Sequence, residues 1–376
     1  MLTFLIIFIG CVCYYAYKYS KNNEQRQLEI NISSLTNGDA NIPVDGINPI
    51  MDVHIKDNQV DTSRIIEYTG TDVKCSQWYP QNFIQFIGQE EAKEQAKTII
   101  QKMKKGIKCH SLMSAIQGHG KSTFVRLIAK ELNARLIERV GKQLDTDSIV
   151  EIVNEINTST EERVIFFLDE LDTCDWKTLK LLNPILQDFQ ISGKKVKPFM
   201  FCSATINKDL LIKQTPDLLD RIQHQIQFKR YNNEEIISIL KQYKQELYPQ
   251  EQISEKTLMV IAQNCKYNPR LCLGILEDYV VTNNITKTLR DRRIIKNGLT
   301  DIDIKILTVL YNATRPIGAN ALAQRVGLSQ NQYTREFEPY LCEFNYLERV
   351  PSRKIAEEGL KILKELKDEN IKEKVL

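Results

Sequence analysis

The sequence predicts an α/β domain with a parallel sheet, followed by a helical domain and a small C-terminal domain of mixed structure. Within residues 76–228, short apolar runs such as "RVIFFLDE" and "PFMFCSA" alternate with helical stretches. This alternation is typical of a parallel sheet that carries helices on both faces. The strand-like runs stop beyond residue 229, and helical periodicity fills residues 229–297. Residues 298–376 mix helices with a β-hairpin that we expect near "YLERVPSRKIA".

The composition limits the classes of function. A chain of 376 residues is long enough for two or three domains with cores of their own. Its net charge of +3 excludes a uniformly basic nucleic-acid coat, so any DNA contact must come from a local patch. The nine cysteines form no CxxC pair, and the four histidines show no ligand spacing. The sequence therefore predicts reduced thiols and no structural zinc.

The first residues differ from the rest of the chain. Residues 1–20 begin with "MLTFLIIFIGCVCYYAY", an uncharged apolar run of about 17 residues, which is the short end of what spans a bilayer. Lys18 and Lys21 follow this run and no basic residue precedes it. The positive-inside rule then predicts a transmembrane anchor with the rest of the chain in the cytoplasm. A cleaved signal peptide and a buried or interfacial segment are the alternatives. Residues 21–75 are polar and non-periodic, which indicates a linker.

A phosphate-binding loop is indicated by "SAIQGHGKSTF" at residues 114–124. Such a loop needs backbone N–H groups that face the anion, a lysine for the β- and γ-phosphates, and a hydroxyl for Mg²⁺. The two glycines allow the close backbone approach, the lysine supplies the charge, and the serine supplies the hydroxyl. We therefore expect ATP and Mg²⁺ to bind at Gly118, His119, Gly120, Lys121, Ser122 and Thr123.

Two positions of this loop are unusual. Ala115 stands where glycine is usual, which is compatible with the turn provided that the residue needs no positive φ. His119 stands where an apolar residue is usual. Its imidazole either tunes the phosphate affinity with pH or faces solvent without a role.

The second half of the candidate site follows a buried strand. The run "VIFFLDE" ends in Asp169 and Glu170. Asp169 suits the magnesium shell together with Ser122, and Glu170 suits the orientation or deprotonation of the attacking water. The alternative is a strand that happens to end in solvated acids. The loop some forty-five residues earlier makes that alternative the weaker one.

Hydrolysis also needs polar and positive groups near the γ-phosphate. Thr205 ends "FMFCSAT", a strand expected beside the previous one, and its hydroxyl can reach the γ-phosphate. Arg221 in "TPDLLDRIQ" and Arg270 in "YNPRLCLGIL" are the candidate cations. Without further context, each arginine is better interpreted as half of a surface ion pair, and its role depends on the order of all the motifs.

The order of these motifs resembles an AAA+ ATPase, and more narrowly the RuvB family of bacterial Holliday-junction branch-migration motors. The resemblance runs from about Trp78 to Gly359. It implies an AAA+ domain, a helical lid and a C-terminal winged helix. It implies further roles for the residues as follows: Ile87 and Gly88 lie against the adenine, Lys121 and Ser122 belong to Walker A, Asp169 and Glu170 to Walker B, Thr205 is sensor 1, Arg221 is the arginine finger, and Arg270 is sensor 2.

The C-terminal phrases carry the narrower resemblance. "GLTDIDIKILTVL", "FEPYLCEFNYLERVP" and "KIAEEG" resemble the winged helix of the RuvB family, which contacts the DNA backbone. From the residues alone, Arg349, Arg353 and Lys354 lie close together on the expected wing, enough for several phosphate contacts. The alternative is a solvated wing that binds protein.

The sequence departs from the family in ways that bear on its partners. Tyr79 stands where the family has arginine, and "DFQISGKKVKPF" leaves only a short turn in place of the long hairpin that docks RuvA. Two interpretations follow. The first is an ATP-driven motor on double-stranded or branched DNA, for which the resemblance implies a homo-oligomer with six subunits. The short turn argues against a standard RuvA partner. The second is a membrane-tethered AAA+ ATPase that remodels or switches a protein partner.

Overall fold

The computed structural model describes residues 55–56, 59–60, 78–206, 208–349 and 351–375. The chain divides into two units, Met1–Lys74 and Cys75–Leu376. In the first unit the described residues form two short antiparallel strands, β1 (Ile55–Lys56) and β2 (Gln59–Val60). The expected anchor at residues 1–20 lies outside the described residues. None of the helices in the described segments is both long and apolar enough to cross a membrane.

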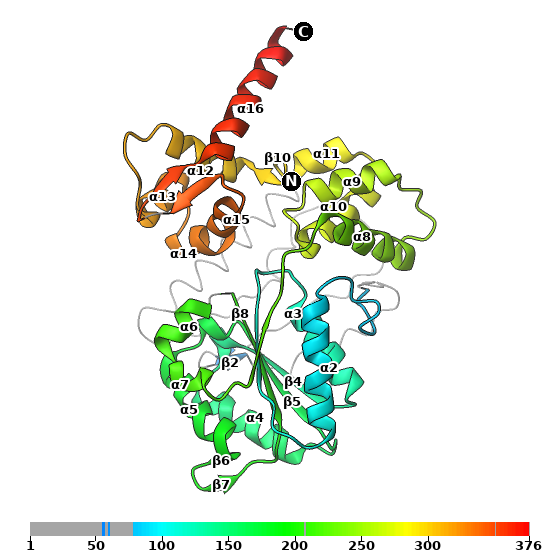
Figure 1. The fold of residues 1–376 in the computed structure, drawn as a ribbon, viewed down its shortest axis with the longest axis vertical. Helices are drawn as coiled ribbons and strands as arrows, with labels where there is room; N and C mark the ends of the chain where they lie inside the picture. Colours follow the sequence, from blue (N-terminus) through cyan, green and yellow to red (C-terminus); the bar gives the residue numbers. More distant parts are fainter. Residues whose placement is uncertain (1–54, 57–58, 61–77, 207, 350, 376) are drawn as a thin grey trace, which may run out of the picture. The chain divides into compact units, whose positions relative to one another are not determined.

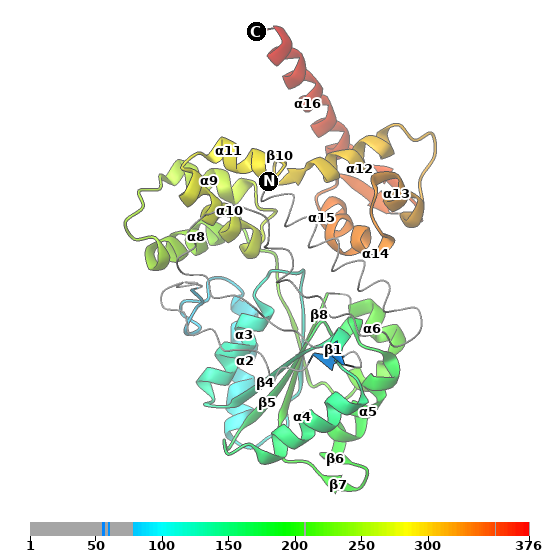
Figure 2. The ribbon, with the colours of Figure 1, turned by 180° about the vertical axis from the view of Figure 1, so that it is seen from behind.

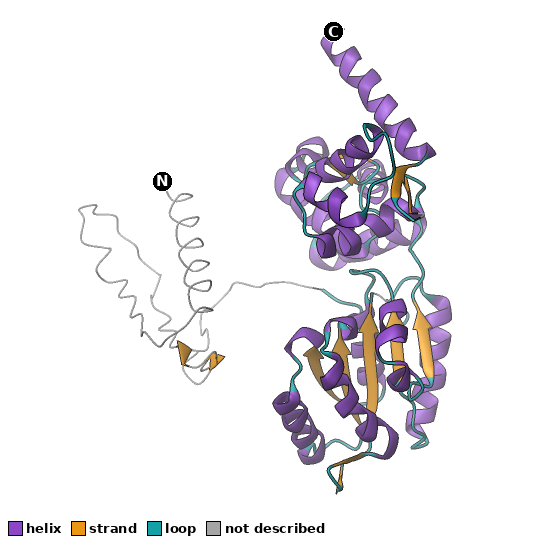
Figure 3. Ribbon diagram, turned by 90° about the vertical axis from the view of Figure 1, so that its left-hand side faces the viewer, coloured by secondary structure: helices purple, strands orange, loops and turns teal. Residues whose placement is uncertain are grey.

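The second unit is built around a five-stranded parallel sheet (Figures 1 and 3). The strand order is β4 (Arg135–Val140), β5 (Val164–Asp169), β8 (Met200–Thr205), β3 (Ser111–Ser114) and β9 (His224–Gln227). Strands β5 and β8 each place apolar side chains on both faces and are buried along almost their whole length. This burial explains the unbroken apolar runs "VIFFL" and "MFC" and confirms the predicted parallel sheet.

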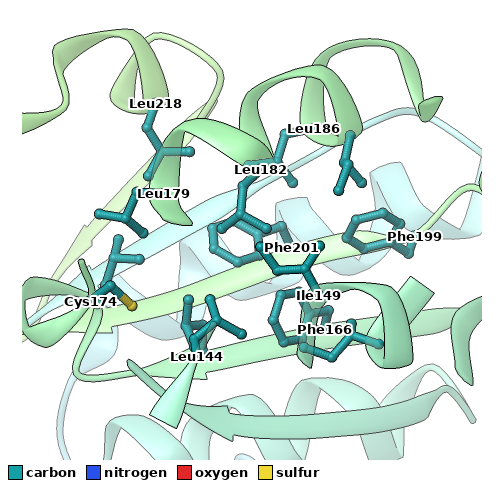
Figure 4. Packing of buried hydrophobic residues seen from close by; sticks show 14 of the residues in the cluster. Leu144, Ile149, Phe166, Cys174, Leu179, Leu182, Leu186, Phe199, Phe201 and Leu218 are labelled. Atoms are coloured by element: carbon teal, nitrogen blue, oxygen red, sulfur yellow. The ribbon is translucent and has the colours of Figure 1, made fainter. Parts of the chain in front are cut away.

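Helices cover both faces of this sheet, which Figure 2 shows from behind. Helices α2 (Glu90–Lys104) and α3 (Lys121–Glu131) pack on one face, where Phe124 lies in one cluster with Phe167 and Met200. Helices α4 (Thr146–Thr158) and α5 (Trp176–Asp188) pack on the other, where Leu182 lies in one cluster with Phe166 and Phe201 (Figure 4). Each such fully buried side chain stabilises the fold by about 1.5–3 kcal/mol.

Short elements follow α5 at one end of the sheet. Strands β6 (Gln190–Ile191) and β7 (Lys194–Lys195) form an antiparallel hairpin with two residues in each strand. The predicted short turn at "SGKK" is therefore confirmed. Helices α6 (Lys208–Gln214) and α7 (Pro216–Leu219) then lead into β9.

A helical domain follows β9, as predicted. It consists of α8 (Asn233–Leu247), α9 (Glu255–Gln263), α10 (Pro269–Thr282) and α11 (Ile285–Asp291). The expectation that strands stop beyond residue 229 is wrong at the end of this domain. There β10 (Ile294–Lys296) pairs with β11 (Leu299–Thr300) across the turn at Gly298.

The C-terminal domain is a winged helix. Helices α12 (Asp301–Tyr311) and α13 (Ala319–Val326) precede a continuous helical run made of α14 (Gln330–Gln332), a π-helical turn η5 (Tyr333–Phe337) and α15 (Glu338–Glu343). The wing is the hairpin of β12 (Leu347–Arg349) and β13 (Arg353–Ile355), which confirms the predicted hairpin. Helix α16 (Glu357–Val375) ends the chain.

Candidate nucleotide site

The phosphate-binding loop joins β3 to α3, as the sequence predicted. Gly118 and Gly120 adopt φ values of +84° and +87°, which favour glycine. A Cβ atom at Gly118 would also collide with the side-chain amide of Asn268. Ala115 does not adopt a positive φ, and its N–H donates to the carbonyl of Thr205 at 3.2 Å. The loop therefore needs no glycine at its first position, which removes the objection raised by Ala115.

Lys121 is the first residue of α3, and its side chain is directed at the loop. Its Nζ donates to the carbonyl oxygens of Ala115 at 2.8 Å and Ile116 at 3.3 Å. Burial lowers the pKa of this ammonium, whereas the nearby carboxylate of Asp169 raises it. Buried in a loop of backbone dipoles, the cation lies where phosphate oxygens would pair with it.

The groups expected to hold Mg²⁺ lie next to one another. The hydroxyl of Ser122 donates to Asp169 Oδ2 at 2.9 Å, across the edge where β5 ends. Hydroxyl and carboxylate oxygens are the ligands that Mg²⁺ takes together with nucleotide phosphates. The donor set therefore fits the ion. Glu170 follows at φ +51°, a left-handed conformation that turns the chain away from the strand direction.

These groups surround one cavity of about 560 Å³. The predicted residues on its wall are Ile87, Gly118, His119, Gly120, Lys121, Ser122, Thr123, Asp169, Glu170, Thr205 and Arg270. Gly88 is not on the wall; it adopts φ +72° beside Glu235, where a side chain would not fit. Predicted residues of the parallel-sheet domain and the predicted lid residue Arg270 thus line the same cavity.

The sequence analysis missed several aromatic residues of this wall. Trp78, Tyr79, Tyr231 and Tyr243 line the cavity, and the rings of Trp78 and Tyr243 meet edge to face at 6.4 Å. The hydroxyl of Tyr243 donates to Glu277 Oε1 at 2.5 Å. Aromatic faces of this kind can stack on a nucleobase. Tyr79 lies in the segment before the loop and was noted only as a departure from the family, whereas no local motif marks Tyr243.

His119 is buried, so the expectation that it faces solvent is wrong. Its side chain is 2% exposed and packs beside Tyr231 with ring centroids 5.8 Å apart. Burial lowers the pKa of the imidazole to about 4, although its contact with the Gln117 carbonyl raises it. The ring is therefore neutral at physiological pH, which also argues against tuning of phosphate affinity through its charge.

Arg221 lies away from this cavity. Its guanidinium donates to the Asp217 carbonyl and, at 2.9 Å, to Gln187 Oε1. The cavity wall does not include it. Within a single chain, Arg221 therefore cannot act on the nucleotide bound beside Lys121, and its predicted role depends on a neighbouring subunit.

The wing separates the three predicted DNA contacts into two kinds. Arg353 pairs with the buried carboxylate of Glu338, with Nε 2.6 Å from Oε1, and its side chain is 13% exposed. Arg349 and Lys354 are 64% and 54% exposed, although each also approaches a carboxylate. The structure therefore favours Arg349 and Lys354 as surface contacts. The ion pair of Arg353 with Glu338 indicates a role in holding the wing on its domain, and its predicted DNA contact stays a prediction.

The comparisons with known proteins agree with this architecture. A family model described as the Holliday junction DNA helicase RuvB P-loop domain matches residues 78–210. A second, the RuvB C-terminal winged helix domain, matches residues 296–364. Among curated relatives, the RuvB subunit of the Holliday junction branch migration complex from Ureaplasma parvum is 29% identical over 305 residues, which cover 76% of this chain and 96% of the relative.

Other relatives and solved structures give the same result. The corresponding subunit of Thermotoga petrophila is 27% identical over 321 residues, which cover 77% of this chain and 92% of the relative. The solved Thermotoga maritima RuvB branch migration motor superposes with a TM-score of 0.67 at 26% identity, and the match covers 76% of this chain and 97% of that one. Fold, site and sequence therefore point to the same family.

Proposed function

Since this chain is a RuvB-type AAA+ protein, we propose that it is an ATP-driven motor that translocates duplex DNA or migrates branched DNA in recombination. One observation carries the proposal: the phosphate-binding loop, the carboxylates that follow β5 and the lid residue Arg270 meet at one cavity, in a chain that also carries a RuvB-type winged helix. A P-loop ATPase joined to a DNA-contacting domain can use the conformational steps of nucleotide hydrolysis to move along DNA.

The residues of the cavity divide the work of hydrolysis. Lys121 and the backbone N–H groups of the loop bind the β- and γ-phosphates, and Glu170 orients the attacking water and accepts its proton. When bound at Ser122 and Asp169, Mg²⁺ supplies charge that stabilises the transferring phosphoryl group. Arg270 enters the cavity from the start of α10 and brings a lid cation toward the phosphates. Closure of the lid then couples the nucleotide state to domain position.

The proposed motor acts as a homo-oligomer. Because Arg221 lies outside the cavity of its own chain, it would complete the site of a neighbouring subunit. A closed ring, with six subunits by analogy with the family, provides one such neighbour for every site. The two-residue strands of β6 and β7 offer little surface to a partner of RuvA type, so we propose that DNA loading does not depend on this hairpin.

We further propose that residues 1–20 tether this motor to a membrane, with the ATPase portion in the cytoplasm. The support is the uncharged apolar run and the lysines that follow it. Removal of these residues should release the protein from the membrane fraction of cells. Unchanged fractionation of the truncated protein would refute the tether.

The motor is tested by the ATPase rate of the full-length protein with and without DNA. We expect duplex and four-way-junction DNA to raise the rate, and we expect the apparent DNA affinity to fall steeply as salt increases, because the contacts are to phosphates. Unwinding of a labelled four-way junction with ATP, but not with a non-hydrolysable analogue, would establish branch migration. A rate indifferent to DNA at low salt would rule out a DNA motor.

A further inference from the structure

Asp172 joins the nucleotide site to the winged helix. It lies three residues after Asp169, in the 3₁₀ turn Leu171–Thr173, and its side chain is 3% exposed. Its Oδ1 accepts the hydroxyl of Thr205 at 2.9 Å and the backbone N–H of Ile206 at 3.3 Å. Its Oδ2 accepts Nη2 of Arg335 at 3.3 Å. One buried carboxylate is thus shared between the sensor threonine and a residue 163 positions later in the chain.

Arg335 comes from an irregular part of the winged helix. It lies in the π-helical turn η5, between α14 and α15. This turn buries Tyr333 and Phe337 in the core of the winged helix, while the Arg335 side chain is 28% exposed. Single π turns within helices are rare and occur often at functional positions. The turn here places the guanidinium against the large domain instead of the core of its own domain.

The hydrogen-bond chemistry of Thr205 makes this shared carboxylate sensitive to nucleotide. A threonine hydroxyl has one proton to donate. In this structure the hydroxyl of Thr205 donates to Asp172, and Thr205 also lies on the wall of the nucleotide cavity. To donate to a γ-phosphate oxygen, the hydroxyl must break its hydrogen bond with Asp172. The buried carboxylate then depends more strongly on Arg335, because a buried charge that loses one partner is costly unless another compensates.

We propose that Asp172 is a positioning residue that couples the γ-phosphate state at Thr205 to the position of the winged helix through Arg335. The coupling rests on the proposed ATPase function and names the route by which that site reaches the DNA-contacting domain. Coupling between two sites is reciprocal. When DNA binding or force at the winged helix displaces Arg335, the hydroxyl of Thr205 therefore donates to Asp172 again, and the rate of ATP hydrolysis changes. The ion pair is thus part of the route along which DNA controls the ATPase.

The first test needs no DNA. Hydrogen exchange of the full-length protein is measured at residues 333–344 with and without a non-hydrolysable ATP analogue and Mg²⁺. We expect the analogue to change exchange in the unmodified protein and the change to fall by about fivefold or more in Arg335→Gln. The affinity for the analogue should stay within about twofold, since Arg335 does not line the cavity. Arg335→Lys retains the charge and should restore much of the change.

A matched control separates this ion pair from any other on the surface. Arg293 pairs with Asp301 at a similar distance of 3.4 Å, but its side chain is 75% exposed. Arg293→Gln should therefore keep the nucleotide-dependent exchange of the unmodified protein. In the double variant Asp172→Asn/Arg335→Gln, the nucleotide-dependent change in exchange should fall by as much as in Arg335→Gln alone. The reason is that both substitutions remove the same ion pair. A loss equal to the sum of the two single losses would count against the shared pair.

The second test uses the DNA stimulation of ATP hydrolysis. Arg335→Gln should lower the stimulated rate toward the basal rate, with a smaller effect on the basal rate itself. If Arg335→Gln keeps both the nucleotide-dependent exchange and the stimulation, the coupling role is refuted. If the unmodified protein shows the exchange change but no DNA stimulation, the proposed motor function fails while the coupling stands. If the unmodified protein shows no exchange change, the coupling fails whatever DNA does.

Discussion

At the scale of single residues, the nucleotide site depends on a small number of side chains whose positions the backbone fixes. Lys121 and Ser122 are the first two residues of α3, so the helix start delivers the ammonium and the hydroxyl to the same phosphate cradle. Asp169 ends β5 and meets Ser122 at 2.9 Å. Because these positions follow from a loop motif and a buried strand, the sequence was sufficient to identify them.

Replacement of Lys121 by alanine removes the cation from the phosphate cradle. We expect ATP hydrolysis to fall by about 10²-fold or more, because a preorganised positive charge at the phosphates is lost. ATP turnover and the binding of a fluorescent ATP analogue measure the effect. Lys130→Ala is the control, since Lys130 is in the same helix but bonds Gln81 at the surface. Undiminished turnover in Lys121→Ala would refute the loop assignment.

His119 and His110 should remain neutral well below their ordinary pKa. Burial lowers the pKa of both imidazoles to about 4. For His110, Nδ1 accepts the N–H of Phe201 at 3.0 Å, which a protonated ring could not do. Imidazole NMR of the labelled protein should show no titration of either ring between pH 8 and about pH 5. Assignment comes from His119→Gln and His110→Gln, and a midpoint near 6.5 for His119 would contradict its burial.

The same shifts set the sign of a stability change. The unfolded chain takes up protons at these histidines near pH 6.5, whereas the folded chain does so only near pH 4. Between these values the unfolded state binds more protons, so the free energy of unfolding falls as the pH falls. His110→Gln should therefore flatten the loss of thermal stability between pH 6.5 and pH 4 relative to the unmodified protein.

Other residues of the site could not be found from the sequence, for a physical reason. Tyr243 reaches the cavity from the middle of α8, and Asp172 acquires its role only because Arg335 folds back onto it. Such contacts join positions far apart in the chain, and neither residue lies in a motif with fixed spacing. The burial of His119 could not be predicted for the same reason, since the ring that packs on it, Tyr231, lies between β9 and α8, far away in the sequence.

At the scale of elements, regular periodicity was predictive and irregular geometry was not. The buried strands β5 and β8 and the wing hairpin follow from apolar runs and from alternation. The π-helical turn η5 left no trace in the pattern, because its residues also suit an ordinary helix. Within the wing, the register pairs Arg349 with Arg353. Both arginines approach the buried Glu338, and proximity in sequence alone could not show that Arg353, at 2.6 Å, is held more closely than Arg349, at 3.7 Å.

Two substitutions in the wing should have different effects on protein stability and on DNA affinity. Arg353→Ala leaves the buried carboxylate of Glu338 without its main partner, which we expect to destabilise the domain by about 3–5 kcal/mol. Arg349→Ala should change the melting temperature little, because the side chain is 64% exposed and its contact with Glu338, at 3.7 Å, is longer than the 2.6 Å contact of Arg353. It should instead weaken DNA binding about uniformly across sequences and lower the salt slope by about one. Calorimetry and fluorescence anisotropy at several salt concentrations measure the two effects.

The reverse outcome would correct the assignment. If Arg353→Ala keeps its thermal stability and loses DNA affinity, its guanidinium contacts phosphate after all. Lys354→Ala is a second surface variant, since Lys354 is 54% exposed and pairs with Glu348, itself 47% exposed. Agreement between Arg349→Ala and Lys354→Ala would define the wing face that meets DNA.

At the scale of the whole second unit, ion pairs and aromatic contacts join the lid to the winged helix. Lys266 of the lid bonds the buried carboxylate of Asp303 at 2.5 Å. Tyr267 stacks on Phe344 with ring planes 5° apart. Arg230, in the hinge between β9 and α8, pairs with Glu343 and lies over the ring of Phe344. A lid that closes on ATP would therefore carry the winged helix with it.

The last prediction concerns the assembly. Arg221→Ala should spare ATP binding, because Arg221 does not line its own cavity, and should abolish hydrolysis, because the neighbouring site loses its cation. A mixture of the Arg221→Ala and Lys121→Ala proteins should recover turnover. The nucleotide site of an Arg221→Ala subunit, which keeps Lys121, can receive Arg221 from a neighbouring Lys121→Ala subunit. Random mixing of equal amounts makes about one interface in four productive, so about a quarter of the unmodified rate is the upper limit in a ring. Arg163→Ala, which removes a surface arginine paired with Glu162, should stay active when assayed alone. If subunit exchange is demonstrated and the mixture stays inactive, the site is not shared between neighbours.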